Sequence, residues 1–578
     1  MNDIINKIID RIYIGGKKMT RQSKFLAKLD ENFQNKGKEV HSITLSNGVE
    51  HVLSWNDLEK DCQSIMHSLS GTGKGVVLIF LRHCSLLPGA FFGAMMAGHT
   101  PAFMPCTSIK QDPILYWSSH QKLLNHILPS AIITSEDVSL EMIKAGLELG
   151  QTELILIENL IAPKEVLPIQ VCSEDAIALL QHSSGTTGLK KGVALSFDAI
   201  VKHADSYSSA IKLGTDDRII SWLPLYHDMG LMACMIMPSY TATPVIQLSP
   251  FEWVGKPHLL FDAIEKYSGT LTWMPNFAFE HMALYAPRMS KEYSLDSMRA
   301  FISCSEVCRP ESFTRFIEAF HHLGMDSTHL QTCYAMAETV FATAQTELGD
   351  TPRAIRVNQL DLNRGNKVKI YDWDSEVQNP RILIETGSII EGLQVEIVDE
   401  NHNKLPKMTI GEVSLSGSFL FDGYYKMPNL TNERFKGNSY LTRDLGFVDD
   451  SGKLYILGRI DDLIIVQGRN VYAHQVEALV SDINGVKAGR ISAFGVFNER
   501  VGSENLILIC EISDILNDAE ISNIKIEIST LLQSTIEIVP KQIKFVELGW
   551  LMKTSSGKVG RKENKAKYLR EKKEAGVK

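Results

Sequence analysis

The sequence predicts an α/β fold with a large N-terminal domain followed by a small α+β C-terminal domain. Short apolar runs, such as residues 76–81 and 176–180, alternate with helix-length segments through most of the chain. That alternation is typical of α/β units built around buried sheets. After Gly392 the sequence pattern changes to that of shorter strands separated by turns. After residue 460 the pattern of a new set of strands and helices begins.

The elements after Gly392 define the two parts that follow the α/β region. Residues 395–398 and 411–415 are expected to be half-exposed strands of a β-rich subdomain at about 392–458. The last part has the size and pattern of a compact domain, so we expect domains at 1–459 and 460–578. Its expected strands are 463–466, 492–496, 506–511 and 543–548, and its expected helices are 473–482 and 519–532.

Composition and charge exclude several classes of protein. The chain has 578 residues, 44% of them hydrophobic, and a net charge of -9, which argues against general nucleic-acid binding. Nine cysteines without metal-like spacing argue against a disulfide scaffold. The N-terminus carries charges where a signal peptide would be apolar, and the uncharged stretches 84–109 and 231–251 are interrupted by proline. We therefore expect a cytoplasmic protein with no transmembrane segment.

The strongest local signal is a Gly- and Ser/Thr-rich segment, residues 181–193, which directly follows a strand-like run. Glycines let successive backbone N–H groups surround a phosphate, and hydroxyls and a lysine add donors and charge. A flexible linker is the alternative, but linkers rarely follow a buried strand. The expected phosphate-binding residues are Ser183, Ser184, Gly185, Thr186, Thr187, Gly188 and Lys191.

This segment resembles the signature loop of the adenylate-forming superfamily, which includes acyl-CoA synthetases, luciferases and the adenylation domains of peptide synthetases. Later motifs of the family follow in the expected order, so the resemblance covers nearly all of residues 40–565. It implies that the N-terminal domain contains two stacked α/β subdomains plus the β-rich subdomain. It also implies a mobile C-terminal domain.

Two further segments resemble the fatty acyl-AMP ligase branch of that superfamily. They are Trp-Leu-Pro-Leu-Tyr-His-Asp-Met-Gly-Leu at 222–231 and Met-Pro-Asn-Phe-Ala-Phe at 274–279. In amino-acid adenylating relatives an aspartate in the first segment can pair with the substrate ammonium, which leaves that alternative open. The resemblance implies an acyl-binding role for His227, Asp228, Met229, Gly230, Pro275, Asn276 and Phe277.

The remaining motifs imply a nucleotide site and a hinge. Tyr334 would stack on adenine, Asp444 would bind the ribose hydroxyls, and Arg459 would reach ribose or phosphate. The implied nucleotide-binding set is Ser305, Glu306, Tyr334, Ala335, Asp444 and Arg459. The implied catalytic residues are Lys558 and Glu338, the implied metal ligands Glu338 and Thr187, and the implied hinge residue Asp461.

The resemblance implies ATP-dependent activation of a medium- or long-chain fatty acid to its acyl-adenylate, with release of pyrophosphate. ATP and Mg²⁺ are the expected cofactors, and a separate acyl carrier protein, or a carrier domain of a polyketide or peptide synthase, is the expected acceptor. A long polar stretch at about 346–385 resembles the branch's insertion, which disfavours transfer to coenzyme A. The alternatives are a fatty acyl-CoA ligase, an amino-acid adenylating enzyme and a non-catalytic acyl-nucleotide sensor.

Overall fold

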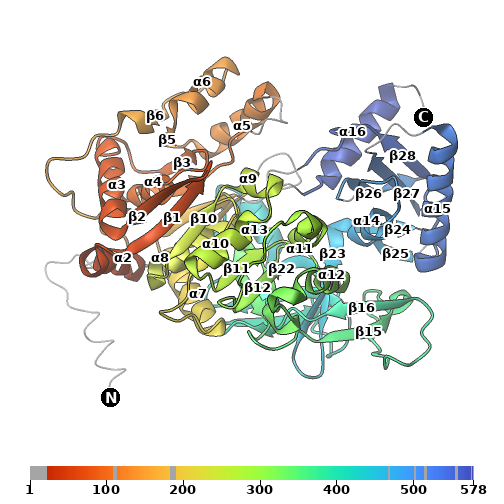
Figure 1. The fold of residues 1–578 in the computed structure, drawn as a ribbon. Helices are drawn as coiled ribbons and strands as arrows, with labels where there is room; N and C mark the ends of the chain where they lie inside the picture. The colour runs from red at the N-terminus through yellow and green to blue at the C-terminus, as the bar shows by residue number, and fades with distance from the viewer. Residues whose placement is uncertain are drawn as a thin grey trace.

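The computed structural model describes residues 22–107, 113–182, 191–466, 469–487, 489–499, 503–512, 517–553, 558–574 and 576. The first eighteen residues, expected to be a short extension, lie outside this part of the chain. Figure 1 shows a large body and, in blue, a smaller lobe formed by the C-terminal elements. The predicted α/β fold class, with a smaller α+β part at the C-terminus, is confirmed.

The main sheet of the body has nine strands in the order β17-β14-β13-β12-β11-β9-β10-β1-β2. Its central strands are parallel, so their carboxyl ends lie at one edge and carry the loops with the predicted site motifs. The strands are β1 Val40–Ser46, β2 Val49–Ser54, β9 Ile219–Ser221, β10 Val245–Leu248, β11 Leu271–Met274, β12 Ala300–Cys304, β13 Leu330–Ala335, β14 Ala342–Gln345 and β17 Ser388–Ile389.

A second α/β unit lies beside this sheet. It contains a parallel four-stranded sheet in the order β4-β3-β5-β6 and a three-stranded antiparallel sheet in the order β20-β8-β7. Strands β4 and β7 lie next to each other, which joins the two sheets. The strands are β3 Val76–Phe80, β4 Thr100–Phe103, β5 Ala131–Thr134, β6 Glu153–Leu156, β7 Ile177–His182, β8 Gly192–Ser196 and β20 Gly423–Tyr424.

Helices cover these sheets. They are α2 Lys24–Lys36, α3 Trp55–Ser68, α4 Leu87–Met96, α5 Pro113–Ile127, α6 Glu136–Lys144, α7 Phe197–Ala210, α8 Met237–Thr241, α9 Pro250–Gly255, α10 Leu259–Tyr267, α11 Asn276–Tyr285, α12 Pro310–Phe320 and α13 Pro428–Arg434. All ten residues of α4 are buried, because the uncharged stretch around it belongs to the core, as expected. In the part of the chain that the structure describes, no helix is long and apolar enough to cross a membrane.

The β-rich subdomain is a sheet in the order β18-β19-β22-β21, with β23 paired to β22. The prediction of half-exposed strands is wrong for β19, whose first five residues are buried. Val413 and Leu415 face the main core, and a second apolar cluster covers other strands of the same sheet. The strands are β18 Leu393–Val398, β19 Gly411–Gly417, β21 Phe435–Lys436, β22 Ser439–Val448 and β23 Leu454–Arg459.

Among the described residues, the stretch predicted to be an insertion contributes five of the twelve buried residues of the second apolar cluster. There β15 Ala354–Asn358 and β16 Pro380–Ile384 form an antiparallel pair. Its Ile355, Val357 and Leu383 pack with residues of β22 and β23 and with Tyr472 of the C-terminal lobe. Figure 1 shows β15 and β16 at the base of the molecule, below that lobe. The pair therefore shares one apolar cluster with both the β-rich subdomain and the lobe.

The C-terminal lobe has a small core of its own, contributed by residues 464–545. The expected strands and helices are present, with bounds that differ by a few residues. They are β24 Leu463–Val466, α14 Ala473–Ser481, β26 Ile491–Asn498, β27 Ser503–Glu511, α15 Asp518–Ile536 and β28 Gln542–Val546. Two further elements, β25 Arg469–Tyr472 and α16 Arg561–Glu574, were not predicted. A short 3-10 turn, Ile460–Asp462, joins the lobe to β23, and the domain boundary at residue 460 remains a prediction.

Candidate active site

Three of the residues predicted to bind nucleotide form one hydrogen-bonded group. Tyr334 is the last residue but one of strand β13, and its buried hydroxyl donates to Asp444 Oδ2 at 2.6 Å. Asp444 and Arg459 are cross-strand partners in β22 and β23, and Arg459 Nε lies 3.3 Å from Asp444 Oδ1. Burial raises the pKa of Asp444, although Arg459 and the Tyr334 hydroxyl act in the opposite direction. The pairing of β22 with β23 thus joins Asp444 to Arg459, and the packing of two different sheets brings Tyr334 to Asp444, 110 positions away.

A second group contains Glu338 and Lys191. Glu338 lies in the 3-10 turn Ala337–Thr339, and its Oε1 accepts a 2.8 Å hydrogen bond from Tyr424. Lys191 Nζ lies 5.2 Å from the centre of the Tyr424 ring. Burial and the charge of Arg434 lower the pKa of Lys191, while Glu338 acts to raise it. The predicted metal ligand and the last predicted phosphate-binding residue therefore face the same tyrosine.

The C-terminal lobe contributes one residue directly to the site. Lys558 Nζ donates to the backbone carbonyl of Ser305 at 2.5 Å, across 253 residues of sequence. Near it, Asp228 Oδ1 lies 2.6 Å from His227 Nδ1 and accepts from the Met229 N–H at 2.9 Å. Burial alone would raise the pKa of Asp228, but His227, Met229 and Lys558 together hold it below its usual value. Asp228 is therefore a charged carboxylate within electrostatic reach of Lys558.

The residues after Asp228 form an unusual helix. Met229–Ile236 is a π-helix with all eight residues buried, and π-helical turns occur frequently at functional sites. A Cβ at Gly230 would lie 2.3 Å from the Pro224 carbonyl oxygen, so only glycine fits this close approach. The start of the π-helix therefore packs directly on the Pro224 backbone. This contact fixes the short segment between them, which carries His227 and Asp228.

The second predicted acyl-binding motif begins helix α11 after Pro275. The buried Asn276 side chain donates to Ser312 Oγ at 3.0 Å and accepts from the Arg309 N–H, which joins α11 to α12. The Phe277 N–H donates to Glu306 Oε2 at 3.0 Å, so Glu306 links the strand near the nucleotide motif to the acyl motif.

Three aromatic rings lie next to one another on the acyl-motif side of the site. The Phe277 ring, 39% exposed, lies 6.1 Å from Trp222, and Trp222 stacks on Trp253 at 3.7 Å. Trp222 belongs to the first acyl motif, so the two predicted acyl motifs are neighbours. Trp253, on α9, was not predicted, because a single tryptophan between motifs gives no local signal.

Asp461, the predicted hinge residue, and Ala335 both lie in described parts of the chain. Asp461 lies in the 3-10 turn between β23 and β24, where Arg443 binds it. Ala335 ends strand β13, directly after Tyr334. The predicted phosphate-binding residues from Ser183 to Gly188 lie outside the described residues, although β7 and β8 pair on either side of them up to His182 and Gly192.

Sequence reasoning missed Tyr424 and Arg443. Tyr424 is 86 residues from Glu338, and the two segments meet where the Phe421 N–H donates to the Glu338 carbonyl at 2.9 Å. Only the folded chain brings these distant segments together, so no local pattern could have identified Tyr424. Arg443 stood inside a recognised motif, but its partner Asp461 could not be read from spacing.

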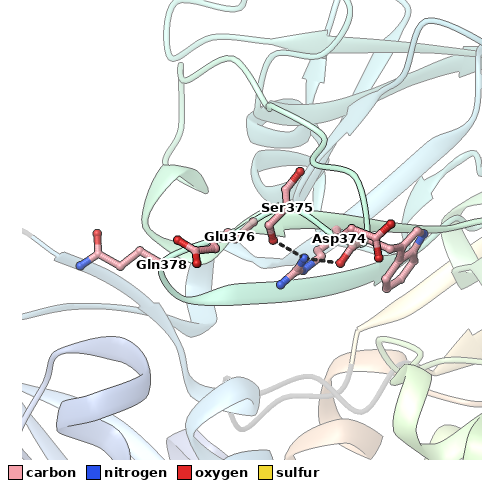
Figure 2. Close-up of a pocket in the computed structure, with 7 residues that line it drawn as sticks. Asp374, Ser375, Glu376 and Gln378 are labelled. Atoms are coloured by element: carbon pink, nitrogen blue, oxygen red, sulfur yellow. Dashed lines mark hydrogen bonds between the residues drawn. The ribbon is translucent and has the colours of Figure 1, made fainter.

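A hollow of about 720 Å³ lies away from this site, on the loop between β15 and β16. Figure 2 shows Asp374, Ser375, Glu376 and Gln378 lining it. Arg356 fixes this loop, since its guanidinium donates to the carbonyls of Trp373 at 2.6 Å and Ser375 at 2.7 Å. None of the predicted site residues lines the hollow, which is therefore separate from the candidate active site.

Comparison of the sequence with known proteins identifies the family to which the chain belongs. The family model described as "AMP-binding enzyme" matches residues 30–425, which is more than half of the chain. The chain belongs to the AMP-binding enzyme family. The matched range contains the phosphate-loop, acyl and Glu338 segments, while Asp444, Arg459, Asp461 and Lys558 lie beyond it.

Individual proteins resemble this AMP-binding enzyme over most of its length. A long-chain-fatty-acid–AMP ligase of Mycobacterium marinum is 28% identical over 82% of this chain and 83% of its own. A medium-chain-fatty-acid–[acyl-carrier-protein] ligase of Moorena producens is 27% identical over 69% of this chain and 68% of its own. A structure from a study of fatty acyl-adenylate ligases of E. coli and L. pneumophila has a TM-score of 0.86 at 23% identity, covering 96% of this chain and 99% of that one. The last comparison shows the shared fold.

Proposed function

We propose that this AMP-binding enzyme activates a medium- or long-chain fatty acid with ATP, forming the acyl-adenylate and releasing pyrophosphate. It then transfers the acyl group to a separate acyl carrier protein or carrier domain. The observation that carries the proposal is the reach of Lys558 from the C-terminal lobe to Ser305, beside Asp228 of the acyl motif. In this arrangement the Lys558 ammonium lies between the large body and the C-terminal lobe, where it can contact both the substrate carboxylate and the α-phosphate of ATP.

The apolar character of the acyl side supports a fatty acid as the substrate. The π-helix Met229–Ile236 is wholly buried and uncharged, and Trp222, Trp253 and Phe277 lie against one another nearby. Two relatives are named as ligases of long-chain and medium-chain fatty acids, respectively. Asp228 is already paired with His227 and Met229, which argues against a role in binding a substrate ammonium.

The residues of the site define how the first step proceeds. Tyr334, Asp444 and Arg459 hold the adenosine so that the α-phosphorus faces the fatty carboxylate. The carboxylate oxygen attacks that phosphorus and the pyrophosphate leaves, so the enzyme needs no nucleophile of its own. Lys558 neutralises the negative charge that develops between carboxylate and α-phosphate, and Lys191 does the same at the leaving phosphates. Catalysis consists of positioning and charge neutralisation.

The Glu338 carboxylate fits a Mg²⁺ ligand. Its oxygen atoms are hard donors, which Mg²⁺ prefers, and it faces Lys191 of the phosphate loop. Held by Glu338, Mg²⁺ would offset the negative charge of the phosphates. Thr187, the second proposed ligand, belongs to the loop outside the described residues.

A carrier protein is the proposed acceptor of the second step. One relative is named as a ligase of an acyl carrier protein. The apolar cluster that Ile355, Val357 and Leu383 share with Tyr472 supports a role for the insertion in restraining the C-terminal lobe. Such restraint would disfavour the lobe arrangement needed for transfer to coenzyme A.

Replacement of Lys558 tests the proposal. We expect Lys558→Ala to slow formation of acyl-adenylate by about 10²–10³-fold, because removing one charge-stabilising group typically costs that much. Transfer from preformed acyl-adenylate should persist, since the lysine is needed only while carboxylate and phosphate react. Pyrophosphate release and single-turnover thiol transfer measure the two steps. Lys573→Ala, on the exposed side of α16, is the matched control. An equal loss of both steps in a folded Lys558→Ala protein would contradict the assignment.

A further inference from the structure

Two adjacent residues of the hinge are held by opposite parts of the molecule. Asp461 Oδ1 accepts from the Arg443 guanidinium at 2.8 Å, and Arg443 belongs to β22 of the large body. Asp462 Oδ2 accepts from Arg561 at 2.8 Å, and Arg561 also binds Glu477 of α14 at 2.6 Å. Asp462 is therefore tied to the C-terminal lobe, while Asp461 is tied to the body.

Arg443 occupies a backbone position that suits glycine. Its φ is 66°, in the left-handed region that residues with a side chain rarely adopt. Its N–H is fixed by Glu412 Oε1 at 2.9 Å, and the next residue, Asp444, binds Tyr334 and Arg459. A strained position is retained only where the surrounding structure imposes it, and such positions concentrate at functional sites. The interaction that an arginine adds here, and a glycine would lack, is the ion pair with Asp461.

The ion pair restricts one rotation of the hinge. The Asp461 carboxylate branches from its Cα, so a change in φ at residue 461 carries the carboxylate away from Arg443. A change in ψ alone leaves it in place. Arg443, Lys562 and Arg434 oppose the effect of burial and keep the pKa of Asp461 below its usual value, so the carboxylate is charged at neutral pH.

We propose that Arg443 is a positioning residue whose ion pair with Asp461 latches the C-terminal lobe in the arrangement that brings Lys558 to Ser305. Release of this latch accompanies the turn of the lobe toward acyl transfer. The inference rests on the proposed two-step function, in which the lobe takes a different arrangement in each step. Both side chains are more than one-third exposed, so the latch is weak enough to open during turnover.

Hydrogen exchange of the full-length protein tests the latch without any substrate. Arg443→Gly removes the guanidinium and suits the backbone, so the fold should tolerate it. We expect residues 460–466 to exchange about two- to fivefold faster, the effect of losing one partly exposed ion pair. Asp461→Asn should produce the same increase, and the double variant should add nothing further, because both changes break one contact. Arg443→Lys, which keeps the charge, should restore most of the protection. Lys436→Ala, on exposed β21 of the same sheet, is the control for simple loss of charge.

The two chemical steps give a second readout. With dodecanoic acid, and with pantetheine as the soluble thiol acceptor, we expect Arg443→Gly to raise the ratio of transfer rate to adenylation rate about two- to fivefold. Unchanged exchange of residues 460–466 would overturn the latch, and so would an equal fall of both rates. Failure of the wild-type enzyme to make any fatty acyl-adenylate would instead refute the proposed function, while the exchange result would still decide whether Arg443 restrains the hinge.

Discussion

At the scale of single residues, one close backbone contact, between Gly230 and the Pro224 carbonyl, fixes the positions of the His227 and Asp228 side chains. Gly230 allows the π-helix to touch the Pro224 carbonyl, and His227 and Asp228 lie in the segment between them. We expect Gly230→Ala to push this segment outward, to lower the free energy of unfolding by about 1–3 kcal/mol and to slow adenylation about 10²-fold. Thermal unfolding and pyrophosphate release measure the two effects. Gly255→Ala in nearby α9, where a Cβ would meet nothing within 4 Å, should leave both unchanged. Wild-type behaviour of Gly230→Ala would show that the contact is not needed.

Many of the site's residues could be predicted, because the family motifs are continuous stretches of sequence. His227, Asp228, Met229 and Gly230 are neighbours in the chain, and so are Tyr334 and Ala335. The contacts between motifs could not be predicted. Tyr424 reaches Glu338 because the Phe421 N–H, three residues before it, binds the Glu338 carbonyl, and Lys558 reaches Ser305 only through the placement of the C-terminal lobe.

At the scale of elements, helices α3 and α4 pack with almost no space between them. A Cβ at Gly89 would lie 2.4 Å from Asp61 Cβ, and one at Gly93 would lie 2.8 Å from the Cys62 carbonyl oxygen. This contact buries the Asp61 side chain, and burial, with a smaller contribution from Asp57, raises the pKa of Asp61 to about 6. The close packing that Gly89 and Gly93 allow therefore places the Asp61 carboxyl where burial disfavours its charged form.

That burial predicts a pH dependence of stability. The folded state holds the Asp61 proton more tightly than the unfolded state, so this group's contribution to stability falls as the pH rises from about 4 to about 6. We expect Asp61→Asn to raise the free energy of unfolding by about 1–2 kcal/mol at pH 8 and to have little effect at pH 3.5, where both side chains are neutral. Denaturant unfolding at the two pH values measures the difference. Glu31→Gln, at an exposed position of α2, controls for general loss of negative charge. Equal effects of Asp61→Asn at both pH values would refute the explanation.

The elements also show where sequence patterns mislead. Strand β19 has the alternating sequence of a half-exposed strand, yet its first five residues are buried. The polar residues of the alternation are buried too, since Glu412 and Ser414 are 3% and 5% exposed and Glu412 accepts a hydrogen bond from the Arg443 N–H. The alternation identified the strand correctly, whereas its burial depends on packing with distant parts of the chain, such as the main core that Val413 and Leu415 face, which no local pattern could place.

At the scale of the whole molecule, the β15–β16 pair shares an apolar cluster with Tyr472 of the C-terminal lobe, and we propose that it restrains the lobe. The Arg353 carbonyl accepts from the Glu385 N–H at 3.0 Å, so the two ends of the β15–β16 unit meet and the unit can be excised. We expect replacement of residues 354–384 by Gly-Ser to raise acyl-CoA formation at least several-fold while adenylation persists, because the lobe then turns more freely. Arg381→Ala is the milder variant, since Arg381 is buried close to Tyr472. Acyl-CoA yield measured against pyrophosphate release decides the matter, and unchanged acyl-CoA output from both folded variants would contradict a restraining role.

The central claim is that the intact enzyme converts a fatty acid and ATP into acyl-adenylate and pyrophosphate. The most direct measurement is mass spectrometry of the products of full-length enzyme with ATP, Mg²⁺ and fatty acids of 8 to 18 carbons (roughly the medium to long chains that a buried apolar site can take), with and without coenzyme A. We predict that fatty acyl-adenylate accumulates together with pyrophosphate, and that coenzyme A adds little acyl-CoA. Absence of acyl-adenylate with every fatty acid would contradict the account, and efficient acyl-CoA synthesis would move the enzyme to the acyl-CoA ligases.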